Sequence, residues 1–120
     1  MSYQFYKILH VFGVILTFAA LGGTAIAAMV RSDDQGARKL TGGTHGAALL
    51  IVLISGFGAL GKAGLGFDLW VWMKLTIWLV IGAALAFVRR APHLARFYWF
   101  ALPALGAAAA YLAVFKPGAG

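Results

Sequence analysis

Two ionisable residues, Lys7 and His10, stand three positions apart at the start of an apolar stretch, Ile8 to Val30, in which His10 is the only ionisable side chain. An imidazole in such a stretch is costly unless it faces a protein interior, where it can bind a metal or bond a neighbouring helix. Residues three, four and seven apart share one helix face. The polar stripe that this spacing creates predicts an inward-facing surface: Lys7, His10, Gly13, Thr17 and Thr24.

Gly13 follows His10 by about one helical turn and would leave space for a flat ligand beside the imidazole ring. Haem b or a related tetrapyrrole is such a ligand, and its iron is commonly held by a histidine. His10 is therefore the candidate haem ligand. The alternative is that His10 only hydrogen-bonds a neighbouring helix near the membrane interface.

Three residues at a spacing of four, Trp70, Lys74 and Trp78, place an ammonium group between two indoles on one helix face. Lys74 is expected on the same side of the membrane as Lys7 and His10. The two lysines and Trp78 could receive the propionates of a haem, or an anionic quinone-like group. The alternative is an interfacial aromatic belt with a snorkelling lysine, and we favour it for Trp70 and Trp72.

His45 and His93 form a second candidate pair, expected at the cytoplasmic ends of the second and fourth apolar runs, where they could ligate one haem iron. The alternative is that both are solvated head-group neighbours. His10 and His45 cannot share an iron in one subunit, because opposite ends of two spans are about 25–30 Å apart. A haem on His10 would be five-coordinate, take a lysine or Met73, or be shared across a dimer.

Composition identifies the surroundings of these residues: 62% of the chain is hydrophobic and 11% is charged, whereas soluble domains carry about 25% charged residues. The sequence therefore predicts a multi-pass membrane protein in which residues 1–120 form a single domain. The chain has no cysteine, which excludes disulfides, thiolate metal ligands and iron–sulfur clusters. All three acids are expected in loops or at a helix start, which argues against a carboxylate-driven proton pump or hydrolase.

Four apolar runs are each close to the length of about 20 residues that crosses a bilayer. The short connections between them place consecutive helices side by side and antiparallel. The predicted fold is thus an all-α, antiparallel bundle of four transmembrane helices, with both termini on one side. The expected spans are residues 5–30, 44–62, 69–89 and 95–115, with Gly42 and Gly43 as a flexible joint before an N-cap at Thr44.

The basic residues predict the orientation of this bundle. Every arginine of the chain, together with Lys39, lies in the expected loops 31–39 and 89–96. The positive-inside rule places these loops in the cytoplasm and both termini outside. Topology and anionic head groups account for the net charge of +7, so no nucleic-acid partner is implied. The basic residues expected on the outer side are Lys7, Lys62, Lys74 and Lys116.

Small residues recur at a spacing of four in Gly42-x-x-x-Gly46 and Gly106-x-x-x-Ala110. Such faces let transmembrane helices approach closely. They support a competing function, a non-enzymatic membrane module that packs against another integral protein or a second copy of the chain. A transporter or channel is a third class, and with four spans it would need a dimer to enclose a path.

Three segments together resemble a known group of proteins: Tyr6-Lys7-x-x-His10, Ser55-Gly56-Phe57-Gly58 and Trp70-x-x-x-Lys74-Leu75. They resemble small bacterial inner-membrane proteins of the SirB family and, more distantly, HemJ, a haem-associated protoporphyrinogen oxidase. The resemblance to HemJ implies His10 as haem ligand or catalytic histidine, with Lys74 as its partner. The shorter chain and its serine-glycine segment fit the SirB-like proteins better, and most of those have no assigned activity.

The sequence therefore predicts an integral protein of the bacterial inner membrane with a tetrapyrrole near its outer half. Electron transfer or tetrapyrrole redox chemistry is the expected function. If the protein is an enzyme, the resemblance and the single histidine of the first span imply a haem-dependent membrane oxidoreductase.

Overall fold

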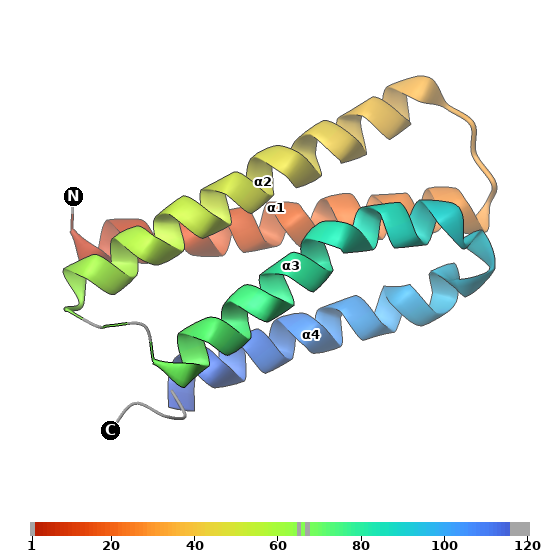
Figure 1. Ribbon diagram of the computed structural model, residues 1–120. Coiled ribbons are helices and arrows are strands. Elements are labelled where there is room, and N and C mark those ends of the chain that lie inside the picture. The colour runs from red at the N-terminus through yellow and green to blue at the C-terminus, as the bar shows by residue number, and fades with distance from the viewer. Residues whose placement is uncertain (1, 65, 67, 116–120) are drawn as a thin grey trace.

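The computed structural model describes residues 2–64, 66 and 68–115, and these form a bundle of long helices (Figure 1). Consecutive helices run antiparallel, so that α1 begins and α4 ends at the same end of the bundle. The all-α class is confirmed for this part of the chain. The elements are α1 (Tyr3–Met29), α2 (Gln35–Lys62), α3 (Leu69–Arg90), the short 3-10 helix η1 (Pro92–Leu94) and α4 (Ala95–Phe115).

Each of the four α-helices is long and apolar enough to cross a membrane. The shortest, α4, has 21 residues and is about 32 Å long at about 1.5 Å per residue, which exceeds the thickness of about 30 Å of a typical hydrocarbon core. Large apolar side chains cover the outside, and Ile8, Leu40 and Phe100 are each at least 70% exposed. An apolar outer surface of this kind is suited to contact with the acyl chains of lipids.

Helix α2 begins at Gln35 and not at Thr44, so the predicted span 44–62 was too short. The Asp34 carboxylate accepts a hydrogen bond from the Ala37 N–H group at 2.9 Å and caps the helix. The glycine pair 42–43 stays helical, because each glycine costs only about 1 kcal/mol relative to alanine. The other three predicted spans agree with α1, α3 and α4 to within two residues.

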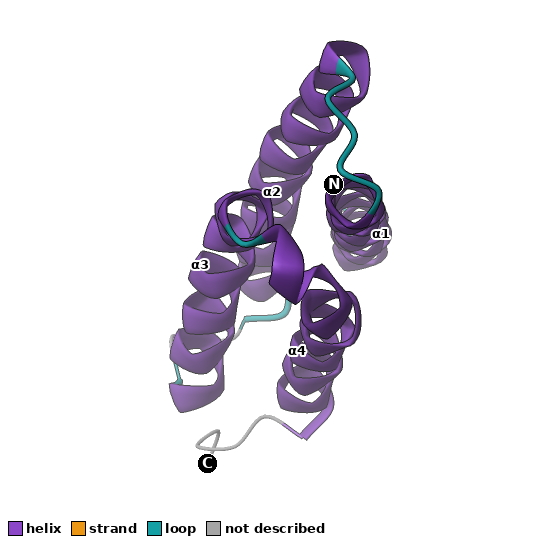
Figure 2. Cartoon of the chain, turned by 90° about the vertical axis from the view of Figure 1, so that its right-hand side faces the viewer, coloured by secondary structure: helices purple, strands orange, loops and turns teal. Residues whose placement is uncertain are grey.

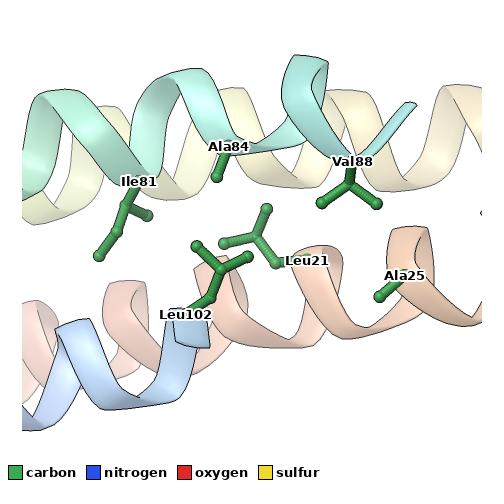
Figure 3. Close-up of a cluster of buried hydrophobic side chains, with 6 residues drawn as sticks. All are labelled: Leu21, Ala25, Ile81, Ala84, Val88 and Leu102. Carbon is green, nitrogen blue, oxygen red and sulfur yellow. The ribbon is translucent and has the colours of Figure 1, made fainter. Parts of the chain in front are cut away.

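Helices α1 and α3 each contact all three other helices, and the most extensive packing is that of α1 on α2. Seen end-on, α2 and α4 stand at opposite corners (Figure 2), and in the described chain their backbones do not lie beside each other. Side chains of α1, α3 and α4 meet in the largest buried cluster (Figure 3). This cluster consists of Leu21, Ala25, Ile81, Ala84, Val88 and Leu102.

A second buried cluster lies toward the end of the bundle where α1 begins. Leu60 of α2, Trp70 and Val71 of α3, and Leu112 of α4 form it. Burial of these side chains joins α2 to α3 and α4 at this end of the bundle. The cluster fixes the wall opposite the first turns of α1, where the candidate residues Lys7 and His10 lie.

Candidate functional site

A cavity of about 200 Å³ lies among α1, α2 and α3 near the beginning of α1. Five of the side chains selected from the sequence line it: Lys7, His10, Trp70, Lys74 and Trp78. The remaining wall is mainly apolar and includes Val52, Leu53, Phe57, Leu60, Val71 and Leu75. The structure thus brings together two lysines, one imidazole and two indoles from helices that are far apart in the sequence.

His10 is half-buried and bonded to α2. Its Nδ1 atom lies 2.9 Å from the Val52 carbonyl oxygen and 3.2 Å from the Ser55 hydroxyl oxygen. Because a carbonyl oxygen only accepts hydrogen bonds, Nδ1 is the donor. Nε2 is then the ring nitrogen that carries the lone pair and remains for a ligand.

Two glycines of α2 make room for aromatic rings of α1. A methyl group added at Gly56 would lie 3.3 Å from Cε1 of His10, and one added at Gly58 would collide with the ring of Tyr6. The segment 55–58 is one of the three that carry the family resemblance. In the structure it forms the surface on which the rings of Tyr6 and His10, one helical turn apart, pack. The signal that could have revealed this is a pair of glycines inside an apolar helix, which often marks close approach.

Each lysine of the cavity lies beside an aromatic ring. The Lys7 ammonium is 5.9 Å from the centroid of the Tyr3 ring, and the Lys74 ammonium is 5.9 Å from that of Trp70. Both distances permit a cation–π interaction. Among the described residues no carboxylate lines the cavity, so the cavity carries positive charge.

The Trp78 indole is anchored across the bundle. Its N–H group donates a hydrogen bond to the Leu49 carbonyl of α2 at 3.2 Å. Lys74 was expected between two indoles, and the cation–π contact that the structure gives is to Trp70. Trp78 contributes a rigid aromatic wall to the same cavity.

Gly13 does not line the cavity, although the sequence predicted space for a ligand there. A methyl group on Gly13 would lie 2.9 Å from the γ-carbons of both Ile51 and Val52. Helix α2 therefore fills the space beside Gly13. The stripe is inward-facing further along α1, where the buried hydroxyls of Thr17 and Thr24 donate to carbonyls of their own helix.

The structure does not join His45 and His93. His45 is only 3% exposed, and its Nε2 lies 3.1 Å from the Ile81 carbonyl oxygen of α3. Because α2 begins at Gln35, His45 lies about three turns inside the helix and not beside a loop. His93 is exposed in η1. In the described chain the backbone of α2 does not lie beside that of η1, so the structure does not bring this pair side by side.

The two small-residue faces differ in what covers them. Gly42 lies against the Arg89 guanidinium, and Gly106 lies against the ring of Phe18, so both are used inside the bundle. Gly43 and Gly46 are exposed, with no described atom within 4 Å of an added methyl group. Lys116, which the sequence assigned to the outer side, lies outside the described residues.

A second cavity, of about 260 Å³, lies between α1 and α4 and is lined by apolar and aromatic residues such as Phe18, Trp99 and Pro103. It has no cationic or imidazole group in its wall. The cavity at His10 thus differs from the second cavity in its lysine and imidazole groups, and it is not the larger of the two.

Within the described chain no three His, Cys, Asp or Glu side chains are arranged to hold a metal ion. An iron bound at His10 would therefore need a macrocycle to supply its other ligands. Comparisons with protein families, curated proteins and solved structures found no match for this chain. The resemblance to SirB and HemJ proteins stays a prediction that rests on the three quoted segments.

Proposed function

We propose that this chain is an integral protein of the bacterial inner membrane that binds haem b or a related tetrapyrrole at the His10 cavity. The observation that carries the proposal is the hydrogen bond from Nδ1 of His10 to the Val52 carbonyl at 2.9 Å, beside a cavity with two lysines. Metal-binding histidines commonly donate their second ring nitrogen to a carbonyl in this way. The arrangement leaves Nε2 available for iron.

The other cavity residues have separate roles in this proposal. Lys7 and Lys74 bind the carboxylates of the ligand, because charge-assisted hydrogen bonds are the strongest that the cavity can offer. Leu53, Val71 and Leu75 exclude water from its apolar faces. With Trp78 fixed by its bond to α2, these groups hold the ligand in one orientation.

The donor set fits a tetrapyrrole that enters edge-on. The cavity volume of about 200 Å³ is below the range of about 300–1,000 Å³ typical of small-molecule pockets. Part of the ring would therefore remain in the surrounding lipid, which tolerates its apolar edge. When bound, the group supplies reversible one-electron chemistry, which suits electron transfer or a haem-dependent oxidoreductase.

The test is to express the protein with a haem supply, purify it in mild detergent and record oxidised and dithionite-reduced absorption spectra. We expect a b-type spectrum that is lost in His10→Ala and retained in His93→Ala, because His93 is exposed in η1. A folded wild-type protein that stays colourless after haem loading would refute the proposal.

A second candidate function, a partner-binding membrane module, is favoured by one observation. Gly43 and Gly46 form an exposed small-residue surface on α2 that nothing in the described chain covers, and such surfaces pack against other transmembrane helices. Under this function Gly46→Leu abolishes co-purification of an integral partner or a second copy, while His10→Ala leaves it intact. The opposite pattern would favour the cavity.

A further inference from the structure

Ser55 is completely buried where α2 faces His10. Its hydroxyl donates to the Ile51 carbonyl of the preceding turn. A longer contact, 3.3 Å, joins the same hydroxyl to the Val52 carbonyl. A serine hydroxyl has a single hydrogen, and these carbonyls of its own helix use it. The side of the Ser55 oxygen that lies 3.2 Å from Nδ1 of His10 therefore carries lone pairs.

Nδ1 of His10 thus faces two acceptors, the Val52 carbonyl at 2.9 Å and the Ser55 hydroxyl oxygen at 3.2 Å. A lone pair on Nδ1 would be repelled by both oxygens, whereas an N–H group is attracted by both. Rotation of the ring by half a turn would replace Nδ1 with a carbon and forfeit both bonds. The surroundings of the ring therefore select one tautomer and one orientation.

The backbone of α2 supports the same orientation. Gly56 stands directly beside the ring, and a methyl group there would lie 3.3 Å from Cε1 and 3.5 Å from Nδ1 of His10. The missing side chain lets the imidazole approach close enough to reach the acceptors at positions 52 and 55. Ser55 thus accepts a hydrogen bond from the imidazole, and Gly56, its neighbour in sequence, leaves room for the ring.

We propose that Ser55 is a positioning residue that, together with the Val52 carbonyl, holds His10 in the Nδ1–H form and presents the lone pair of Nε2 to the cavity. What Nε2 then binds rests on the function proposed above. The tautomer itself is a property of the chain without ligand, so it can be measured separately. The same arrangement makes His10 an acceptor and not a donor toward any molecule in the cavity.

The first test is ¹⁵N NMR of histidine-labelled protein without haem, at a pH where the imidazole is neutral. The chain has three histidines, and loss of signals in His10→Ala assigns those of His10. We expect wild-type His10 in the Nδ1–H form. Ser55→Ala removes one of two acceptors and should raise the Nε2–H fraction relative to Nδ1–H about three- to tenfold, as expected for one hydrogen bond.

A matched control is Thr17→Val, because Thr17 also carries a buried hydroxyl that donates to its own helix but does not contact His10. This variant should leave the tautomer ratio of His10 unchanged. A wild-type protein with His10 in the Nε2–H form would overturn the proposal without any variant. So would a folded Ser55→Ala protein with the wild-type ratio.

The second test uses the haem-loaded protein. A weaker acceptor on Nδ1–H makes the imidazole a poorer electron donor, so Ser55→Ala should favour ferrous over ferric haem. A threefold change in that preference raises the midpoint potential by about 30 mV, at about 59 mV per tenfold for one electron. If no haem binds but the NMR result holds, the proposed function fails and the tautomer inference stands. If haem binds and Ser55→Ala changes neither ratio nor potential, the inference fails.

Discussion

Substitution of Gly13 tests how the contact between α1 and α2 supports the cavity. A methyl group at this position would lie 2.9 Å from two γ-carbons of α2, on Ile51 and Val52, and 3.2 Å from the Val52 backbone nitrogen. Ordinary contact begins at 3.4 Å, so the two helices would have to separate by several tenths of an ångström. The side chains can yield in part, but the backbone nitrogen cannot yield without moving α2.

Overpacking of this kind costs about 1–3 kcal/mol, and the better helix propensity of alanine returns up to about 1 kcal/mol. Compared with a glycine-to-alanine change at an open position, which gains the same helix propensity, Gly13→Ala should therefore lower the free energy of unfolding by about 1–3 kcal/mol. Because Val52 also accepts the bond from His10, the same movement should weaken haem binding.

The assay is reversible unfolding of the purified protein in mixed micelles, followed by circular dichroism, with haem titration of the folded variants. Gly43→Ala is the matched control, because no described atom lies within 4 Å of the methyl group it adds. It should be neutral or slightly stabilising. A Gly13→Ala protein as stable as Gly43→Ala, with unchanged haem affinity, would refute the packing that we describe.

Three further predictions concern single contacts. Lys74→Gln should weaken haem binding about three- to tenfold but leave binding of the haem dimethyl ester unchanged; equal losses for both in spectroscopic titrations would exclude a carboxylate contact. Trp78→Phe removes the bond to the Leu49 carbonyl and should cost about 1 kcal/mol in chemical unfolding; no loss would show that the bond contributes nothing. Arg89→Gln removes the hydrogen bonds that its guanidinium donates to the Arg38 carbonyl at 2.8 Å and to the Thr41 hydroxyl at 3.2 Å. Backbone amide hydrogen exchange should then become faster in the first turns of α2. Unchanged protection of these amides would show that Arg89 does not stabilise them.

Much of the fold follows from the distribution of apolar residues. Runs of about 20 apolar residues can satisfy their backbone in lipid only as helices, so α1, α3 and α4 were predicted nearly residue by residue. The start of α2 was missed, because polar residues and a glycine pair resemble a loop. Asp34 directly before Gln35 is an N-cap signal that the sequence does contain.

The cavity was predictable only in part. Lys7 and His10 share a helix face near the start of α1, and Lys74 and Trp78 lie at a similar depth on α3, which runs parallel to α1, so helical geometry alone brings them near one another. The partners of His10 on α2 could not be predicted, because they depend on how α2 is rotated about its own axis. That rotation is set by packing at Gly13, where the sequence suggested a ligand.

Chemical rescue can show whether His10 ligates the haem iron. His10→Gly should fail to form the b-type spectrum, and added imidazole should restore that spectrum by occupying the vacated space beside Val52 and Ser55. A His10→Gly protein that binds haem with the wild-type spectrum in the absence of imidazole would contradict ligation by His10.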